Sequence, residues 1–428
     1  MALGGGTFVA QNKILPGSYI NFVSKSKANA NLSDRGFVTM PLELDWGKDS
    51  EIFTVTNSDF EKNCLSIFGY ENTDEKMKGL RDLFLNAQTL YAYRLNSGEK
   101  ASNEYATAKC SGIRGNDLKV VIQKNVDEET KYDVTLYLGT VLVDSQTVTS
   151  AAELKENDYV VYNTSSTLEV TAGIALSNGT NGTVSGVNYQ DYFDKVESYS
   201  YNVMGIVSTD ETIKTLAVNF CKRLRDEIGA KFQVVVHKKA ADYEGVINVI
   251  NNDTAELVYW VTGVEAGCAI NKSCLNRQYD GEFDVNTNYT QAQLETAIED
   301  GQFVLHSVGG DVRVLKDINS LVTTSDEKGE IFKDNQTIRV IDQIANDIAT
   351  LFNTKYLGAI PNDASGRISL WNDIVKHHES LQEMRAIQDF SDSNIEISQG
   401  NDKGTVVVKD VITIVNTMTQ LYMTVTID

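Results

Sequence analysis

Proline is scarce in this sequence: 428 residues contain only 3, where an average usage of about 5% would give about 21. Proline-rich segments form stiff, extended linkers, so their absence argues against domains joined by linkers of that type. Hydrophobic residues make up 42% of the chain, which is typical of a folded protein and excludes a disordered acidic chain. At this length we expect two or three domains with ample buried core.

Positive charge is also in short supply, because 38 Lys and Arg stand against 59 Asp and Glu and leave a net charge of −21. Nucleic acids and anionic membranes repel such a chain, and no basic block interrupts the acidic background. We therefore expect neither nucleic-acid binding nor membrane binding. The negative charge favours solubility at high concentration.

Cysteine and histidine are few, with five and four residues and no CxxC pair. Cys268 and Cys274 stand six residues apart, and a zinc site there would need further ligands nearby. Free thiols in a reducing compartment are the expectation, with no metal and no cofactor. No apolar run approaches the about 20 residues of a membrane span, and the first residues do not resemble a signal peptide, which predicts synthesis in a cytoplasm.

Catalytic motifs are absent too. The chain has no GxxxxGK[ST] phosphate loop, no GxGxxG, no HExxH and no GxSxG. His377 and His378 are adjacent in a predicted helix, where neighbouring side chains point about 100° apart, so we expect an exposed helix face and not a shared metal. These absences predict no catalytic residues and no enzyme activity.

What the sequence does contain is a change of pattern along the chain. Residues 96–188 carry short strands between turn residues and predict an inserted β-sandwich or barrel. Strands then alternate with amphipathic helices, including one over 210–228 that stops at Gly229, and two over 333–354 and 366–387. The pattern predicts a multi-domain α/β (α+β) protein.

The C-terminus is rich in strand-forming residues. In 421–427, apolar and polar side chains alternate with a period of two, and 406–415 is a ten-residue strand candidate without a breaker. A terminus of this kind, with no covering helix after it, leaves a strand edge that needs a partner. The pattern alone leaves two alternatives: a partner strand in another molecule, or an internal edge strand of the same domain.

Nine motifs follow one another along the chain. They are PGSYINF (16–22), SGIRGNDLKVVI (111–122), LSNGTNGTVSGVNYQDYF (176–193), GAKFQVVV (229–236), YEGVINVIN (243–251), AGCAINKSCLNRQYDG (266–281), RVIDQIANDIATLF (339–352), YLGAIPND (356–363) and LYMTVTID (421–428). Each is weak alone, but the ordered set resembles the tail sheath proteins of contractile phage tails. The resemblance is strongest to the short sheath subunits of myophages and of phage-tail-like bacteriocins of Gram-positive bacteria.

The resemblance implies a subtilisin-like α/β core without protease activity, a C-terminal sheath domain, an inserted all-β domain and two terminal strand arms. The expected divisions are 1–25 (N-terminal arm), 26–95 (first part of the core), 96–188 (β insert), 189–325 (core), 326–403 (sheath domain) and 404–428 (C-terminal arm). In such proteins the arms add strands to sheets of neighbouring subunits. The residues expected in these arm strands are Tyr19, Ile20, Phe22, Val406, Val408, Ile412, Ile414, Leu421, Met423, Val425 and Ile427.

The resemblance also implies partners. Six copies would form each ring, rings would stack helically around a tail tube, and baseplate and tail terminator proteins would bind the ends. A trigger would convert a metastable extended sheath into a contracted one and drive the tube through a cell envelope. A locally basic helix predicts the tube contact; its residues are Lys376, His377, His378 and Arg385.

Such a protein would be made in the bacterial host cytoplasm and end in a phage tail or a headless tail-like particle. Two other classes stay open at this point. One is a β-rich surface or secreted structural protein, and the other is an α/β hydrolase with an unrecognised site.

Overall fold

The computed structural model of the chain describes residues 32–427. These residues form two compact units. The large unit contains 33–346, 384–388 and the residues from 414 onward, and the small unit contains 347–383 and 389–413. Among the described helices, none is long and apolar enough to cross a membrane.

A seven-stranded sheet forms the centre of the large unit, in the order β13-β12-β11-β10-β1-β3-β2. All neighbours are parallel except β2, which runs antiparallel to β3. The strands are β1 (Phe37–Leu42), β2 (Ile52–Thr56), β3 (Thr89–Arg94), β10 (Val203–Ile206), β11 (Gln233–His237), β12 (Val246–Val249) and β13 (Gln302–Phe303). Strands β10, β11 and β12 are buried at every position, as the apolar runs of a parallel sheet require.

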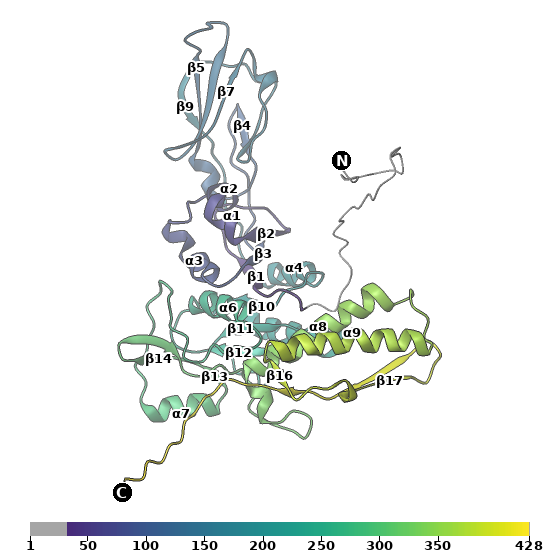
Figure 1. Ribbon diagram of the computed structural model, residues 1–428. Helices are drawn as coiled ribbons and strands as arrows, with labels where there is room; N and C mark the ends of the chain where they lie inside the picture. Colours follow the sequence, from purple (N-terminus) through teal and green to yellow (C-terminus); the bar gives the residue numbers. More distant parts are fainter. Residues whose placement is uncertain (1–31, 428) are drawn as a thin grey trace, which may run out of the picture. The chain divides into compact units, whose positions relative to one another are not determined.

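Helices cover both faces of this sheet (Figure 1). On one face α3 (Lys78–Phe84) and α6 (Leu257–Gly267) pack together over Val38, Met40 and Ile247. On the other face α4 (Gly186–Val196) and α5 (Glu211–Arg223) enclose a second core. The large unit is therefore an α/β/α arrangement. Shorter helices complete it: α1 (Asn57–Lys62), α2 (Cys64–Phe68) and α7 (Gln291–Glu299).

The β-rich stretch predicted from the sequence forms sheets with a hydrophobic core of their own, and it ends before α4 begins at Gly186. A four-stranded sheet has the order β7-β6-β5-β9, and β4 pairs with β8. The strands are β4 (Ala106–Ala108), β5 (Leu118–Lys124), β6 (Tyr132–Leu138), β7 (Val141–Val148), β8 (Val160–Tyr162) and β9 (Thr171–Ala175). Trp46, from the chain before the insert, is fully buried in this core.

The helix predicted over 210–228 is confirmed, with a refinement at its end. Helix α5 continues into a π-helical turn over Leu224–Ile228, and Gly229 then adopts a left-handed conformation with φ of 90°. Only glycine adopts that conformation without steric cost, so the residue ends the helix as predicted. Helix α4 was not predicted, because its first residues lie in an Asn- and Gly-rich stretch that the sequence suggests is a loop.

The small unit is built from two helices and a hairpin. Helix α8 (Asn335–Leu351) begins in the large unit and ends in the small one, and α9 (Ala364–Glu383) packs against β17 (Ile395–Gln399). Strand β17 pairs antiparallel with β18 (Val406–Asp410). Its core contains Leu351, Tyr356, Leu370, Ile374 and Ile395.

Four short strands remain in the described chain. Strands β14 (Leu305–Val308) and β15 (Asp311–Val314) form an antiparallel hairpin in the large unit. Strand β16 (Ile387–Gln388) pairs with β19 (Thr413–Ile414).

Candidate assembly interface

The segment that follows β19 carries several large apolar side chains that are exposed. Val415 donates its amide to Ala386 O at 2.9 Å and Thr417 donates to Gln336 Oε1 at 3.0 Å, which anchors the start of the segment in the large unit. Beyond that point, no residue up to 427 belongs to a strand or helix. The exposed apolar side chains are Met418 (98%), Leu421 (85%), Tyr422 (87%), Met423 (75%), Val425 (68%) and Ile427 (90%).

The strand predicted over 421–427 does not form, for a physical reason. A strand needs hydrogen-bond partners along at least one edge, and in the described chain no other strand lies beside this segment. The alternation of Leu421, Met423 and Val425 with Tyr422 and Thr424 is the pattern of a strand with one apolar face. The sequence therefore encodes a strand whose partner this chain does not supply among its described residues. Exposed apolar surface of this kind is common at interaction sites.

The ten-residue strand predicted over 406–415 is divided in the structure. Its first half is β18, which pairs in register with β17 from Ile395↔Asp410 to Gln399↔Val406. Ile412 lies between strands and is half-buried, and Ile414 belongs to β19. Val406 and Val408 thus pair with a strand of their own chain. Of the two alternatives left open by the sequence, this part of the terminus is an internal edge strand and not a strand paired with another molecule.

Strand β18 still has one edge available. The hairpin of β17 and β18 has no third strand among residues 32–427. A cavity of about 90 Å³ in the small unit, lined by apolar side chains together with Asn362 and Arg367, includes Val406 of β18 in its wall. The other apolar residues of the wall are Phe352, Tyr356, Leu357, Ile360, Pro361 and Leu370. An open strand edge beside apolar surface is where another chain can add a strand.

The predicted residues of the N-terminal arm, Tyr19, Ile20 and Phe22, lie outside the described residues.

The expectation that His377 and His378 lie on an exposed helix face is wrong. Both imidazoles are fully buried in the small unit. His377 Nε2 lies 3.0 Å from Asp347 Oδ2, and His378 Nε2 lies 2.8 Å from Asp410 Oδ2. Each histidine thus faces a carboxylate from another part of the unit, so burial costs less than the sequence suggests. A buried side chain cannot contact a tube protein without rearrangement.

The two rings also lie closer than helix geometry alone predicts, since their Nδ1 atoms are 3.4 Å apart. Rotation about the side-chain bonds removes the 100° divergence of the backbone vectors. His378 Nδ1 lies 3.0 Å from Ile374 O while its Nε2 faces Asp410. Each ring nitrogen of His378 therefore lies within hydrogen-bond distance of an oxygen atom. This contact holds β18 to α9.

Lys376 and Arg385, the other predicted tube contacts, are exposed. They belong to different units, because α9 ends at Glu383 and not near 387 as predicted. Arg385 adopts a left-handed conformation with φ of 63°, which is incompatible with a continuing helix.

Four family models match consecutive parts of the chain. They describe the Gp18 domain III N-terminal region of tail sheath proteins (35–95), the phage tail sheath protein beta-sandwich domain (96–181), the phage tail sheath protein central domain (182–320) and the phage tail sheath C-terminal domain (327–428).

Individual proteins agree with these models. The phage-like element PBSX protein XkdK of Bacillus subtilis is 32% identical over 445 residues, covering 94% of this chain and 95% of the relative. The crystal structure of a sheath tail protein from Desulfitobacterium hafniense is 34% identical, has a TM-score of 0.78 and covers 93% of this chain and 100% of its own.

A more distant neighbour is the contracted helical sheath of the anti-feeding prophage. It is 12% identical with a TM-score of 0.57, and the match covers 97% of this chain and 100% of the neighbour's chain. At this identity the match shows only that the two proteins share a fold. The architecture, the matched domains and the relatives agree with the resemblance inferred from the motifs. The chain is a phage tail component and belongs to the family of contractile phage tail sheath proteins.

Proposed function

We propose that this chain is the repeating structural subunit of a contractile sheath, and that its copies join by exchanging terminal strands. The observation that carries the proposal is the extended, apolar and unpaired segment 418–427. In the proposed assembly this segment adds to a sheet of the next subunit. Residues 1–25, with Tyr19, Ile20 and Phe22, form the second arm.

The chemistry of a donated strand explains both the pattern and the exposure. Main-chain hydrogen bonds to the neighbour would supply affinity, and alternate apolar side chains would set the register. Burying Leu421, Met423, Val425 and Ile427 is worth about 1.5 to 3 kcal/mol each, against about 1 to 2 kcal/mol per residue to order the backbone. These terms nearly cancel, so one arm binds weakly and many arms in one particle act together.

The free edge of β18 and the cavity beside it are the receiving surface that we propose. Val406 and Val408 then belong to the acceptor and Leu421, Met423, Val425 and Ile427 to the donor. This division differs from the expected single arm over 404–428, because β18 is already paired within its chain.

In the proposed particle, hexameric rings stack around a tail tube, with baseplate and tail terminator proteins at the ends. Contraction is a two-state change in which subunits move as rigid bodies while the arms keep them joined. The functional divisions proposed are those expected from the sequence, except that β18 stays with the sheath domain and the C-terminal arm is the segment 418–427. The proposal keeps a subtilisin-like core, no catalytic role and synthesis in the bacterial host cytoplasm. The tube contact is proposed for Lys376 and Arg385 only, since the two histidines are buried.

The experiment introduces asparagine on either the apolar face or the polar face of the segment 418–427. One variant carries Leu421→Asn and Val425→Asn, and the control carries Thr424→Asn and Thr426→Asn. Purified proteins are compared by negative-stain microscopy and sedimentation, with circular dichroism as a check on folding. We expect hollow cylinders from the wild type and the control, and folded single subunits from the apolar-face variant.

Two results would contradict the proposal. One is a wild-type protein that stays a single small particle under every condition. The other is an apolar-face variant that assembles as well as its control.

A further inference from the structure

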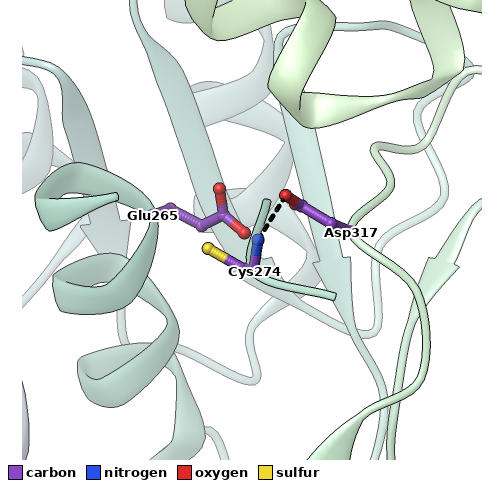
Figure 2. A group of neighbouring side chains, drawn as sticks. All are labelled: Glu265, Cys274 and Asp317. Atoms are coloured by element: carbon purple, nitrogen blue, oxygen red, sulfur yellow. Dashed lines mark hydrogen bonds between the residues drawn. The ribbon is translucent and has the colours of Figure 1, made fainter. Parts of the chain in front are cut away.

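Three potential metal ligands meet in the interior of the large unit. Glu265 comes from α6, Cys274 from the loop after it, and Asp317 from the segment after β15. One ligand atom from each lies within 4.8 Å of the others, and all three side chains are buried. Figure 2 shows both carboxylates turned toward Cys274, whose amide donates to Asp317 Oδ2 at 2.8 Å.

Each carboxyl group binds Arg339 through one oxygen, and the two carboxyl groups also lie within hydrogen-bond distance of each other. Arg339 donates to Glu265 Oε2 at 2.5 Å and to Asp317 Oδ2 at 2.6 Å. Glu265 Oε1 and Asp317 Oδ1 are buried and receive no hydrogen bond from a nitrogen or hydroxyl donor, so a proton shared by the two carboxyl groups, or a metal ion in its place, would satisfy them. Unpaired buried acceptors are rare because each has lost its hydration without compensation. Carboxylates that ligate a metal are themselves hydrogen-bonded in most metal sites, and Arg339 supplies such hydrogen bonds here.

A second thiol stands beside the first. Cys268 and Cys274 are in hydrogen-bond contact, and Cys268 is only half-buried, so it connects the cluster to the surface.

Two arginines supply the rest of the charge. Arg339 spans the carboxylates, and Arg35 donates to Cys268 O at 2.9 Å and to Glu265 O at 3.1 Å. With both carboxyl groups and both thiols deprotonated, as zinc binding requires, the four ligands would carry four negative charges against the two positive charges of the arginines. A divalent cation makes the cluster neutral, which a buried site requires.

We propose that Glu265, Cys268, Cys274 and Asp317 bind one zinc ion in the large unit. Thiolates select zinc over calcium and magnesium, which take oxygen ligands. Tetrahedral zinc with sulfur at about 2.3 Å and oxygen at about 2.0 Å places its ligand atoms about 3.3 to 3.8 Å apart. The ligand atoms of Glu265, Cys274 and Asp317 lie within 4.8 Å of one another, and Cys268 would join them through its contact with Cys274. The ion would tie the end of α6 to α8 through Arg339, and this role does not depend on the proposed mode of assembly.

The first measurement is the metal content of the full chain purified from zinc-supplemented culture. We expect one zinc ion per chain in the wild type and in Cys221→Ser, which removes another buried thiol of the same unit. We expect the zinc to be lost in Cys274→Ser. A wild type without zinc, or a Cys274→Ser variant that keeps it in full, would overturn the proposal.

A second measurement applies if Cys274→Ser does not fold, because it uses the wild type alone. Cobalt added to chelator-treated protein should give the intense visible bands of a tetrahedral thiolate site, and added zinc should abolish them. Zinc should also protect Cys268 from alkylation but not Cys110, which is half-buried elsewhere.

The competing chemistry is a disulfide between the same thiols, and mass spectrometry distinguishes it. Trypsin cleaves after Lys272, between the two cysteines, so a disulfide would join two peptides in an unreduced digest of freshly purified protein. We expect separate peptides. A linked pair, or no cobalt bands, would overturn the zinc site.

Discussion

The ion pair between Arg225 and Asp342 yields the sharpest prediction about what holds the large unit together. Arg225 lies in the π-helical turn after α5 and Asp342 in α8, 117 residues later. The guanidinium donates to Asp342 Oδ2 at 2.5 Å and to Oδ1 at 2.9 Å, and the side chains are 4% and 9% exposed. Burial opposes the charge on Arg225, but Asp342 outweighs it and keeps the pKa of Arg225 above its usual range.

Asp342→Asn keeps the shape and removes the charge. The amide accepts one of the two hydrogen bonds, while its NH₂ group faces a guanidinium N–H and repels it. Arg225 then remains buried without a counter-charge, and breaking a buried pair in this way costs about 3 to 5 kcal/mol. We expect that loss in the free energy of unfolding of the large unit, measured by urea denaturation of the dilute full chain with circular dichroism and fluorescence.

The control is the same substitution in an exposed pair. Asp253 pairs with Lys238 at 2.8 Å but is fully exposed, so Asp253→Asn should leave the unfolding curve unchanged. The double variant Arg225→Met with Asp342→Leu should recover most of the loss, because paired apolar replacement removes the unmatched charge. An Asp342→Asn protein as stable as its Asp253→Asn control would refute the reasoning.

Two further predictions concern packing and thiol chemistry. A Cβ atom at Gly263 in α6 would lie 2.4 Å from Leu83 O, a backbone atom of the α3 segment, so Gly263→Ala should destabilise the large unit by about 1 kcal/mol or more despite better helix propensity. Gly186→Ala in α4, where no atom lies within 4 Å, should not destabilise it; equal melting temperatures for the two variants would contradict this. In metal-free protein, iodoacetamide should modify Cys268 with a half-maximal rate near pH 7, because its thiolate forms as the pH rises through a pKa of about 7. Cys221, whose pKa burial raises to about 12, should stay unmodified, and peptide mass spectrometry that finds both labelled equally would refute the assignment.

Helices, strands and caps that depend on neighbouring residues could be predicted from the sequence. The apolar run at 234–236 forms a buried strand, and Thr290 with Gln293 three residues later forms a capping box that starts α7 with both reciprocal hydrogen bonds. Gly229 ends the π-turn after α5. Each of these features depends on backbone geometry and on contacts a few residues apart, which a single sequence records directly.

Partners that are distant in the chain could not be predicted in the same way. The sequence places His377 and His378 in a helix, but only the fold brings Asp347 and Asp410 to them and makes burial tolerable. The same holds for Arg339, which reaches Glu265 and Asp317 from another helix. No spacing rule reveals such contacts, because hydropathy records what a side chain prefers and not what stands beside it.

The C-terminus shows most clearly which features the sequence determines and which depend on the tertiary structure. The sequence by itself determined that 421–427 has the alternation of a strand, since alternation is a property of consecutive residues. Only the tertiary structure decided that β18 is paired within the chain while the last residues are not. The physical reason is that a strand is completed by hydrogen bonds to a neighbour, and the neighbour is a property of the fold.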